Sequence, residues 1–395
     1  MRVAGCSIYG FTNMARTPEL TDRLPLRSNP TGQGLILAAL GILALGVVVV
    51  HSASMSVAPR APWYSRTEIR HTIFAVLACG ILFVGWYFDY RRLMRGRHVP
   101  VIPAAALIIS LICGLLVFWP GIGWSVGGYH RWIRAGPGEY AIGFQPSELI
   151  KLTLIVFLAA WLSRDSADVR SWKTFLPAVA VIALAVATIV TEDFGMAALI
   201  CIVTGVTMLL AGVPILYLLG LLPPAAAGFY LFVMRVPHRW VRITAMWNVW
   251  HQGDPGTYQP RMSLVTILSG GWLGRGPGAG IQKMFVPENT TDFIFAVYCE
   301  EWGFVGALLL IGLLVLWIWQ SRRAAVGAPD KFGRLLAASL GCLVALQAAL
   351  HIAVNLVVAP PTGISFPFMS AGGTALVTMP LAAALMVSVT ARSRK

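Results

Sequence analysis

The sequence predicts an all-α, polytopic integral membrane protein of about ten transmembrane helices, with a long extracytoplasmic loop between the seventh and eighth spans. Of its 395 residues, 57% are hydrophobic and 12% are charged, whereas a soluble domain has about 25% charged residues. The apolar residues form runs that approach the roughly 20 residues needed to cross lipid. Basic residues cluster between these runs, so the net charge of +14 reflects membrane topology and not nucleic-acid binding.

Ten apolar runs define the expected spans, and they must be helices because a backbone in lipid has to satisfy its own hydrogen bonds. In chain order they cover residues 34–53, 71–88, 99–119, 145–163, 175–191, 194–211, 213–234, 293–319, 335–358 and 374–391. We expect one membrane domain over residues 34–391. A disordered cytoplasmic tail is expected over 1–33, and a basic cytoplasmic tail over 392–395.

The basic clusters also predict the orientation of the spans. Four arginines lie between residues 91 and 97, and four basic residues lie between 322 and 334. With ten spans, both clusters are on the side that the two termini share. Because short loops rich in Lys and Arg stay in the cytoplasm, both termini are expected there. The loops 120–144, 235–292 and 359–373 then face outward.

Two ionisable residues, Glu148 and Lys151, lie within the fourth span. Charged groups in lipid are costly and often functional. Their spacing of three residues places them on one helix face, where they can pair. A structural ion pair that locks the helix bundle and a functional pair are both open interpretations.

Acidic residues also lie at the ends of two other spans. Asp193 follows Glu192 at the start of the sixth span, where it could cap the helix or take a direct role. Glu300 and Glu301 lie about two turns into the eighth span. Adjacent residues on a helix point in different directions, so at most one of them is expected to face a site, while the other pairs or reaches the membrane surface.

The loop 235–292 is too long to be a plain connector. It contains the amphipathic stretch YQPRMSLVTIL, which could lie flat at the interface, and the glycine-rich stretch SGGWLGRGPGAG. Glycine lets a backbone approach a ligand closely, and Arg275 and Lys283 beside it could bind phosphates. A flexible hinge is an equally good interpretation of the glycines.

Asp292 ends this loop, at the start of the eighth span. It could be an ordinary helix cap. It could also be a catalytic carboxylate at the membrane surface, where lipid head groups are presented. The residues alone leave these two interpretations equal.

Four motifs resemble those of the SEDS family (shape, elongation, division and sporulation), which includes FtsW, RodA and SpoVE. They are GGYHRWIRAG with FQPSELIKL, YQPRMSLVTILSGGWLGRG, VPENTTDFIFAVYCEEWG, and NLVVAPPTGISFPFMSAGGTAL. The resemblance covers about residues 34–391. It implies a protein that polymerises lipid II into the glycan strands of peptidoglycan, in division or elongation, with a slight similarity toward FtsW.

The resemblance also implies roles for residues. The aspartate of the family's TDFIFA motif is Asp292, the implied catalytic carboxylate. Glu148 and Lys151 match the family's QPSE-x-x-K element at a central cavity. The implied substrate-binding residues are Arg131, Trp132, Glu148, Lys151, Asp193, Arg275, Lys283 and Glu288. The sequence departs from the family at Thr290, where histidine is common, and in TEDFGM, where the family has QPDLGT.

The expected reaction is glycosyl transfer with a lipid pyrophosphate as leaving group. Asp292 would act as general base, and Arg131, Lys151, Arg275 and Lys283 are the cations available for the pyrophosphate. A divalent cation, Mg or Mn, is a possible cofactor and no organic cofactor is expected; the sequence contains no dedicated metal cage. A flippase that transports lipid II and a scaffold without chemistry are the alternatives. By resemblance, the protein lies in the bacterial cytoplasmic membrane, and its partner is a class B penicillin-binding protein, a transpeptidase.

Overall fold

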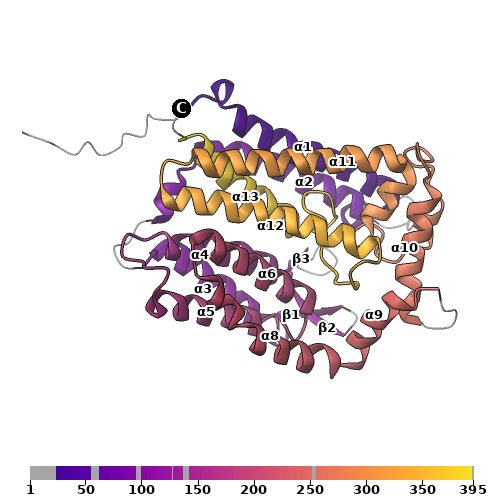
Figure 1. Cartoon of the computed structure of the whole chain (residues 1–395). Helices are drawn as coiled ribbons and strands as arrows, with labels where there is room; N and C mark the ends of the chain where they lie inside the picture. Colours follow the sequence, from indigo (N-terminus) through magenta and orange to yellow (C-terminus); the bar gives the residue numbers. More distant parts are fainter. Residues whose placement is uncertain are drawn as a thin grey trace, which may run out of the picture.

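The computed structural model describes residues 24–54, 62–94, 99–126, 128–136, 142–250 and 255–393. These residues form a bundle of long helices that run side by side (Figure 1). The bundle consists of α1 (Pro30–Ser54), α2 (Thr67–Tyr87), α3 (Val101–Leu116), α4 (Pro146–Leu162), α5 (Trp172–Ala187), α6 (Phe194–Ala211), α7 (Ile215–Leu219), α8 (Leu222–Phe229), α11 (Ile294–Gly327), α12 (Lys331–Asn355) and α13 (Ala375–Thr390). Each predicted span overlaps one of these helices or, for the seventh, the α7–α8 pair.

Six helical segments in the described part of the chain are long and apolar enough to cross a membrane. They are α1, α2, α6, α11, α12 and the segment Ile215–Met234, which contains α7 and α8. The helices α3, α5 and α13 are apolar but have only 16 residues each. The helix α4 has 17 residues and carries the charged pair. The chain is therefore a multi-pass membrane protein.

The ends of the predicted domain need adjustment. Helix α1 begins at Pro30 instead of residue 34, after a short 3-10 turn at Leu26–Ser28. The N–H of Leu24 donates to the carbonyl of Ala391 at 2.8 Å, so the end of the predicted tail packs against the end of α13. Residues 1–23, the rest of that tail, lie outside the described residues, as do residues 394 and 395 of the basic tail.

Span seven was predicted as one helix over 213–234, but it is broken. Two turn residues, Gly220 and Leu221, interrupt the α-helical hydrogen bonds between α7 and α8, although both keep right-handed helical backbone angles. A π-helical turn follows at Tyr230–Met234. Two prolines, Pro223 and Pro224, open α8, and proline cannot donate the backbone hydrogen bond that a continuous helix needs. Neither α7 nor α8 contains a buried residue.

A small antiparallel sheet was not expected from the sequence. It joins α3 to α4 and has the order β1 (Gly123–Val126), β2 (Tyr129–Ala135) and β3 (Ile142–Phe144). In the register, Trp124 lies opposite Trp132, and aromatic cross-strand pairs stabilise such ribbons. Gly128 takes the positive φ of 84° that the turn between β1 and β2 requires. The sheet gives the polar residues of β2 fixed positions.

The long loop between spans seven and eight is folded. It contains α9 (Pro237–Trp247) and α10 (Tyr258–Ser269), which lie at the same end of the bundle as the sheet (Figure 1). The C-terminus is at the opposite end. Helix α10 packs against α11 and α12, and the Oγ of Ser263 donates to the carbonyl of Asn355 at 2.8 Å. The predicted amphipathic stretch is thus a helix that supports the start of α11.

Candidate functional site

Asp292 lies in the turn immediately before α11, and its carboxylate does not cap that helix. The cap position is Phe293, without a side-chain hydrogen bond. Within the described part of the chain, the carboxylate of Asp292 accepts no hydrogen bond. Of the two interpretations of this residue, the helix cap is therefore wrong, and the carboxylate is available for another role.

The backbone around Asp292 is fixed by the segments that end α12 and precede α13. The amide of Asn355 donates to the carbonyl of Asp292 at 3.0 Å, and the hydroxyl of Ser370 donates to the carbonyl of Thr291 at 2.8 Å. The N–H of Ala371 donates to the carbonyl of Thr290 at 2.9 Å. A carboxylate on such a fixed backbone can be held in one reacting geometry.

The surroundings raise the pKa of Asp292 from its ordinary value of 3.8 to about 7. Burial of the carboxyl group is the main cause, and the negative charges of Glu288 and Asp193 add to it. Arg131 and Arg242 act in the opposite direction by favouring the charged form. The side chain is half-buried, so it combines desolvation with access to a ligand.

Arg131 and Asp292 approach one another at Gly363, in the loop before α13. A Cβ atom on Gly363 would lie 3.5 Å from Arg131 Nη1 and 3.6 Å from Asp292 Oδ2. Gly363 also has a positive φ of 70°, which favours glycine. This position therefore leaves free space between a cation and the candidate catalytic carboxylate.

Strand β2 and the start of α6 hold Arg131 in place. Its Nε donates to the carbonyl of Glu192 at 2.8 Å, and its Nη1 lies 3.6 Å from Asp193 Oδ2. Its guanidinium also lies over the ring of Tyr129, 4.7 Å from the centroid. The residue predicted from the motif is thus fixed at the base of a site and remains partly exposed.

Asp193 both caps a helix and faces the site. Its Oδ1 accepts from the N–H of Met196 at 3.0 Å, so the cap interpretation is confirmed. Its Oδ2 is buried without a hydrogen-bond partner and faces Arg131. Burial raises the pKa of Asp193, and the charge of Arg131 partly offsets this effect.

A cavity of about 210 Å³ lies between β2, α6, α9 and the loop after α12. Its polar wall is formed by Tyr129, Arg131, Asp193, Arg239, Arg242 and Thr362. Arg239 and Arg242 were not predicted from the sequence. Their three-residue spacing in PHRWVR, on a helical turn of the outer loop, was the available signal. Arg239 is bound to backbone carbonyls of Val190, Thr191 and Phe232, whereas Arg242 is exposed.

Two other predicted residues lie at the edges of this region. The ring of Trp132 packs in the sheet, 3.1 Å from where a Cβ of Gly143 would lie. Glu288 is exposed, with a positive φ of 53°, and its carboxylate accepts from the hydroxyl of Thr291 at 3.1 Å. Glu288 therefore adjoins Asp292, while the contacts of Trp132 are those of a sheet residue.

Glu148 and Lys151 are buried and paired, as the spacing predicted. Lys151 Nζ lies 2.8 Å from Glu148 Oε2 and 2.7 Å from Gln347 Oε1 of α12. The hydroxyl of Thr378 in α13 donates to Glu148 at 3.3 Å. The pair thus connects three helices, and Lys151 is 1% exposed.

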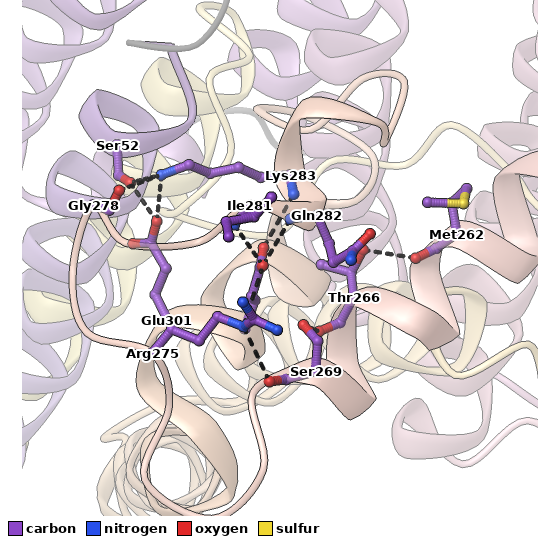
Figure 2. A network of polar contacts seen from close by, with 11 residues as sticks. Ser52, Met262, Thr266, Ser269, Arg275, Gly278, Ile281, Gln282, Lys283 and Glu301 are labelled. Carbon is purple, nitrogen blue, oxygen red and sulfur yellow. Dashed lines mark hydrogen bonds and ion pairs between the residues drawn. The ribbon is translucent and has the colours of Figure 1, made fainter.

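The two cations beside the glycine-rich stretch are engaged with glutamates. Lys283 is 3% exposed, and its Nζ lies 2.7 Å from Glu301 Oε1 (Figure 2). Arg275 is more exposed, and its Nε lies 3.9 Å from Glu300 Oε1. Both glutamates are buried and partnered, so the expectation that one of them faces a site gives way to two separate internal contacts.

No group of three or more His, Cys, Asp or Glu side chains among the described residues has the arrangement of a metal site. Any divalent cation near Asp292 and Asp193 would need most of its ligands from a bound substrate.

Comparisons with known proteins agree on one family. The model of the cell cycle protein family FtsW/RodA/SpoVE matches residues 33–395. A probable peptidoglycan glycosyltransferase FtsW of Nitrosococcus halophilus is 36% identical over 369 residues, covering 91% of this chain and 92% of the relative. A solved structure of a peptidoglycan synthase complex, which concerns the structural coordination of polymerization and crosslinking, contains a similar chain. The TM-score is 0.72 and the identity is 26%, and the match covers 91% of this chain and 97% of that chain. A crystal structure of an aspartate-to-alanine mutant of the rod shape determining protein RodA of Thermus thermophilus matches with a TM-score of 0.65 and 25% identity. The match covers 92% of this chain and 98% of that chain.

Proposed function

Because the chain belongs to the FtsW/RodA/SpoVE family of cell cycle proteins, we propose that it is a peptidoglycan glycosyltransferase that polymerises lipid II into glycan strands. The observation that carries the proposal is the half-buried carboxylate of Asp292, with a pKa of about 7 and Arg131 across Gly363. The 36% identity to a relative named FtsW supports the similarity to FtsW that the motifs indicated.

Asp292 is the general base of the proposed reaction. The acceptor hydroxyl of one lipid-linked sugar attacks the anomeric carbon of the other, the bond from that carbon to the pyrophosphate breaks, and the hydroxyl proton passes to Asp292. A base is most effective when its pKa is near the working pH, and such catalysis contributes about 10²–10⁴-fold to the rate. The raised pKa of Asp292 gives it this property.

The leaving pyrophosphate needs positive charge. Arg131 and Arg242 both favour the negative charge on Asp292 and line the same cavity, so they are the cations we assign to the pyrophosphate. Lys151 and Lys283 are buried in ion pairs, so their charge is already neutralised. A divalent cation held by the pyrophosphate itself would add Lewis-acid stabilisation of the same leaving group.

We place the reaction at the outer face of the bacterial cytoplasmic membrane, with both termini in the cytoplasm. The basic clusters between spans support this orientation. The similarity to a chain of a peptidoglycan synthase complex supports a crosslinking partner, for which a class B penicillin-binding protein is the proposed class. Lipid II and the lipid-linked glycan strand are the proposed substrates.

A lipid II flippase is the alternative that the buried pair Glu148–Lys151 favours, because transport depends on polar groups inside the bundle. The purified protein in detergent micelles separates the two functions, since micelles have no second compartment to which lipid II could be moved. We expect glycan strands from lipid II in micelles, seen as a ladder on a gel. Intact lipid II in micelles, together with its translocation in liposomes, would contradict the proposal. A scaffold would do neither.

A further inference from the structure

The glycine-rich loop is bound tightly to α11 at a kink in that helix. Gly303 in α11 has a positive φ of 64°, and a Cβ on it would lie 2.2 Å from the nitrogen of Gly274. The N–H groups of Arg275 and Gly276 donate to the carbonyls of Glu300 and Glu301, both at 3.0 Å. Gly274 and Gly303 therefore permit close backbone packing, which favours a fixed loop over a flexible hinge.

Side chains of α11 then hold the end of this loop. The carboxylate of Glu300 accepts three backbone N–H groups, from Ile281 at 2.7 Å, Gln282 at 2.8 Å and Lys283 at 3.0 Å. The Nζ of Lys283 points back to Glu301, as Figure 2 shows. Two neighbouring acids of α11 thus hold one lysine by its backbone and by its ammonium group.

The lysine also connects the loop to α1. Its Nζ donates to the hydroxyl of Ser52 at 2.5 Å and to the carbonyl of Gly278 at 3.2 Å (Figure 2). The hydroxyl of Ser52 in turn donates to Glu301. Each of the three donors of the ammonium group therefore has an acceptor, in surroundings where the lysine is 3% exposed.

One further hydrogen bond leads from this network to the turn of the site. The amide of Asn289 donates to the carbonyl of Lys283 at 2.8 Å, and Asn289 itself is buried. Asn289 precedes Asp292 by three residues, in the same turn. The turn is thus held on one side by Lys283 through Asn289, and on the other by Asn355 through the carbonyl of Asp292.

We propose that Lys283 and Glu301 are positioning residues, which hold the turn that carries Asp292 in its reacting geometry. The role rests on the proposed function, because Asp292 is the group that is positioned. It replaces the expectation that Lys283 binds phosphate, since the ammonium group is buried and fully partnered.

The experiment compares the double variant Lys283→Met/Glu301→Met with the parent protein. Removal of one partner leaves a buried charge and destabilises the fold, whereas replacement of both by apolar residues can preserve stability. We therefore expect melting temperatures well below that of the parent for each single variant, and close to it for the double variant. Met284→Ala is the matched control, because Met284 is the adjacent residue and is exposed.

Three measurements decide the proposal. In the double variant we expect kcat for lipid II polymerisation to fall by about 10–100-fold with little change in KM, because a displacement of about 1 Å has such an effect on rate. Hydrogen–deuterium exchange should become faster in residues 286–293 of the double variant. Met284→Ala should match the parent in kcat, in KM and in exchange. A stable double variant with the parental kcat would refute the positioning role of Lys283 and Glu301, whatever its hydrogen-exchange rates. A parent protein without polymerase activity would refute the proposed function, and the exchange rates would still decide whether the pair holds the turn.

Discussion

The pKa of Asp292 predicts how the polymerisation rate depends on pH. A general base acts only when it is ionised, so kcat/KM should rise as Asp292 of the free enzyme loses its proton. With a pKa of about 7, the ionised fraction rises from about one tenth at pH 6 to about nine tenths at pH 8, so kcat/KM, which reports groups of the free enzyme, should rise about tenfold. An aspartate with the ordinary pKa of about 3.9 would be ionised throughout this range and would give no rise.

The neighbours of Asp292 predict the direction in which the midpoint moves. Glu288 raises the pKa of Asp292, so Glu288→Gln should shift the midpoint to lower pH. Arg131 lowers this pKa, so Arg131→Gln should shift the midpoint to higher pH, besides its effect on substrate binding. Asp193 and Arg242, the other charged groups that act on Asp292, remain unchanged in both variants.

The assay is kcat/KM, measured in detergent micelles at lipid II concentrations well below KM, between about pH 5.5 and 9. The ionic strength is kept constant, because salt screens such interactions. A midpoint near 7 that moves in opposite directions in the two variants supports Asp292 as the base. A profile that is flat between pH 6 and 8, or a midpoint that neither variant moves, would refute the reasoning.

Two further predictions concern residues that support the site. Glu148→Gln or Lys151→Met alone should reduce the free energy of unfolding by about 3–5 kcal/mol, because each leaves a buried charge unpaired. In thermal unfolding, the double variant should recover much of this loss. Single variants as stable as the parent would contradict the interpretation that the pair locks the helix bundle. Asn355→Ala removes the donor to the carbonyl of Asp292 and the acceptor of the Ala296 N–H. It should cost about 1–3 kcal/mol and lower kcat more than it changes KM; an unchanged kcat would show that this hydrogen bond does not hold Asp292.

Local patterns in the sequence predicted the features that depend on neighbouring residues. The spans follow from apolar runs, and the Glu148–Lys151 pair follows from a spacing of three residues on one helix. The cap by Asp193 also depends only on the backbone of the next turn. These features need no knowledge of how the helices pack.

Features that depend on distant segments could not be predicted. Ser52 meets Lys283 across 231 residues of sequence, and nothing in either neighbourhood indicates the other. The arginines of α9 line one cavity with residues from the start of α6, a segment that is distant in the sequence. The strands β1 to β3 are short, and the polar residues of the central strand β2 are typical of a loop. The resemblance to a family identified Arg131, but its approach to Asp292 required the three-dimensional structure.

Replacement of the catalytic carboxylate tests the central claim most directly. Asp292→Asn keeps the shape of the side chain and removes the base, and Glu68→Gln makes the same change at an acid in the first turn of α2. The measurement is the rate of lipid II polymerisation by each purified protein, with matched melting temperatures as proof of folding. Asp292→Asn should lose at least about 10²-fold in rate, while Glu68→Gln should equal the parent. A folded Asp292→Asn variant that polymerises lipid II at the parental rate would contradict the account.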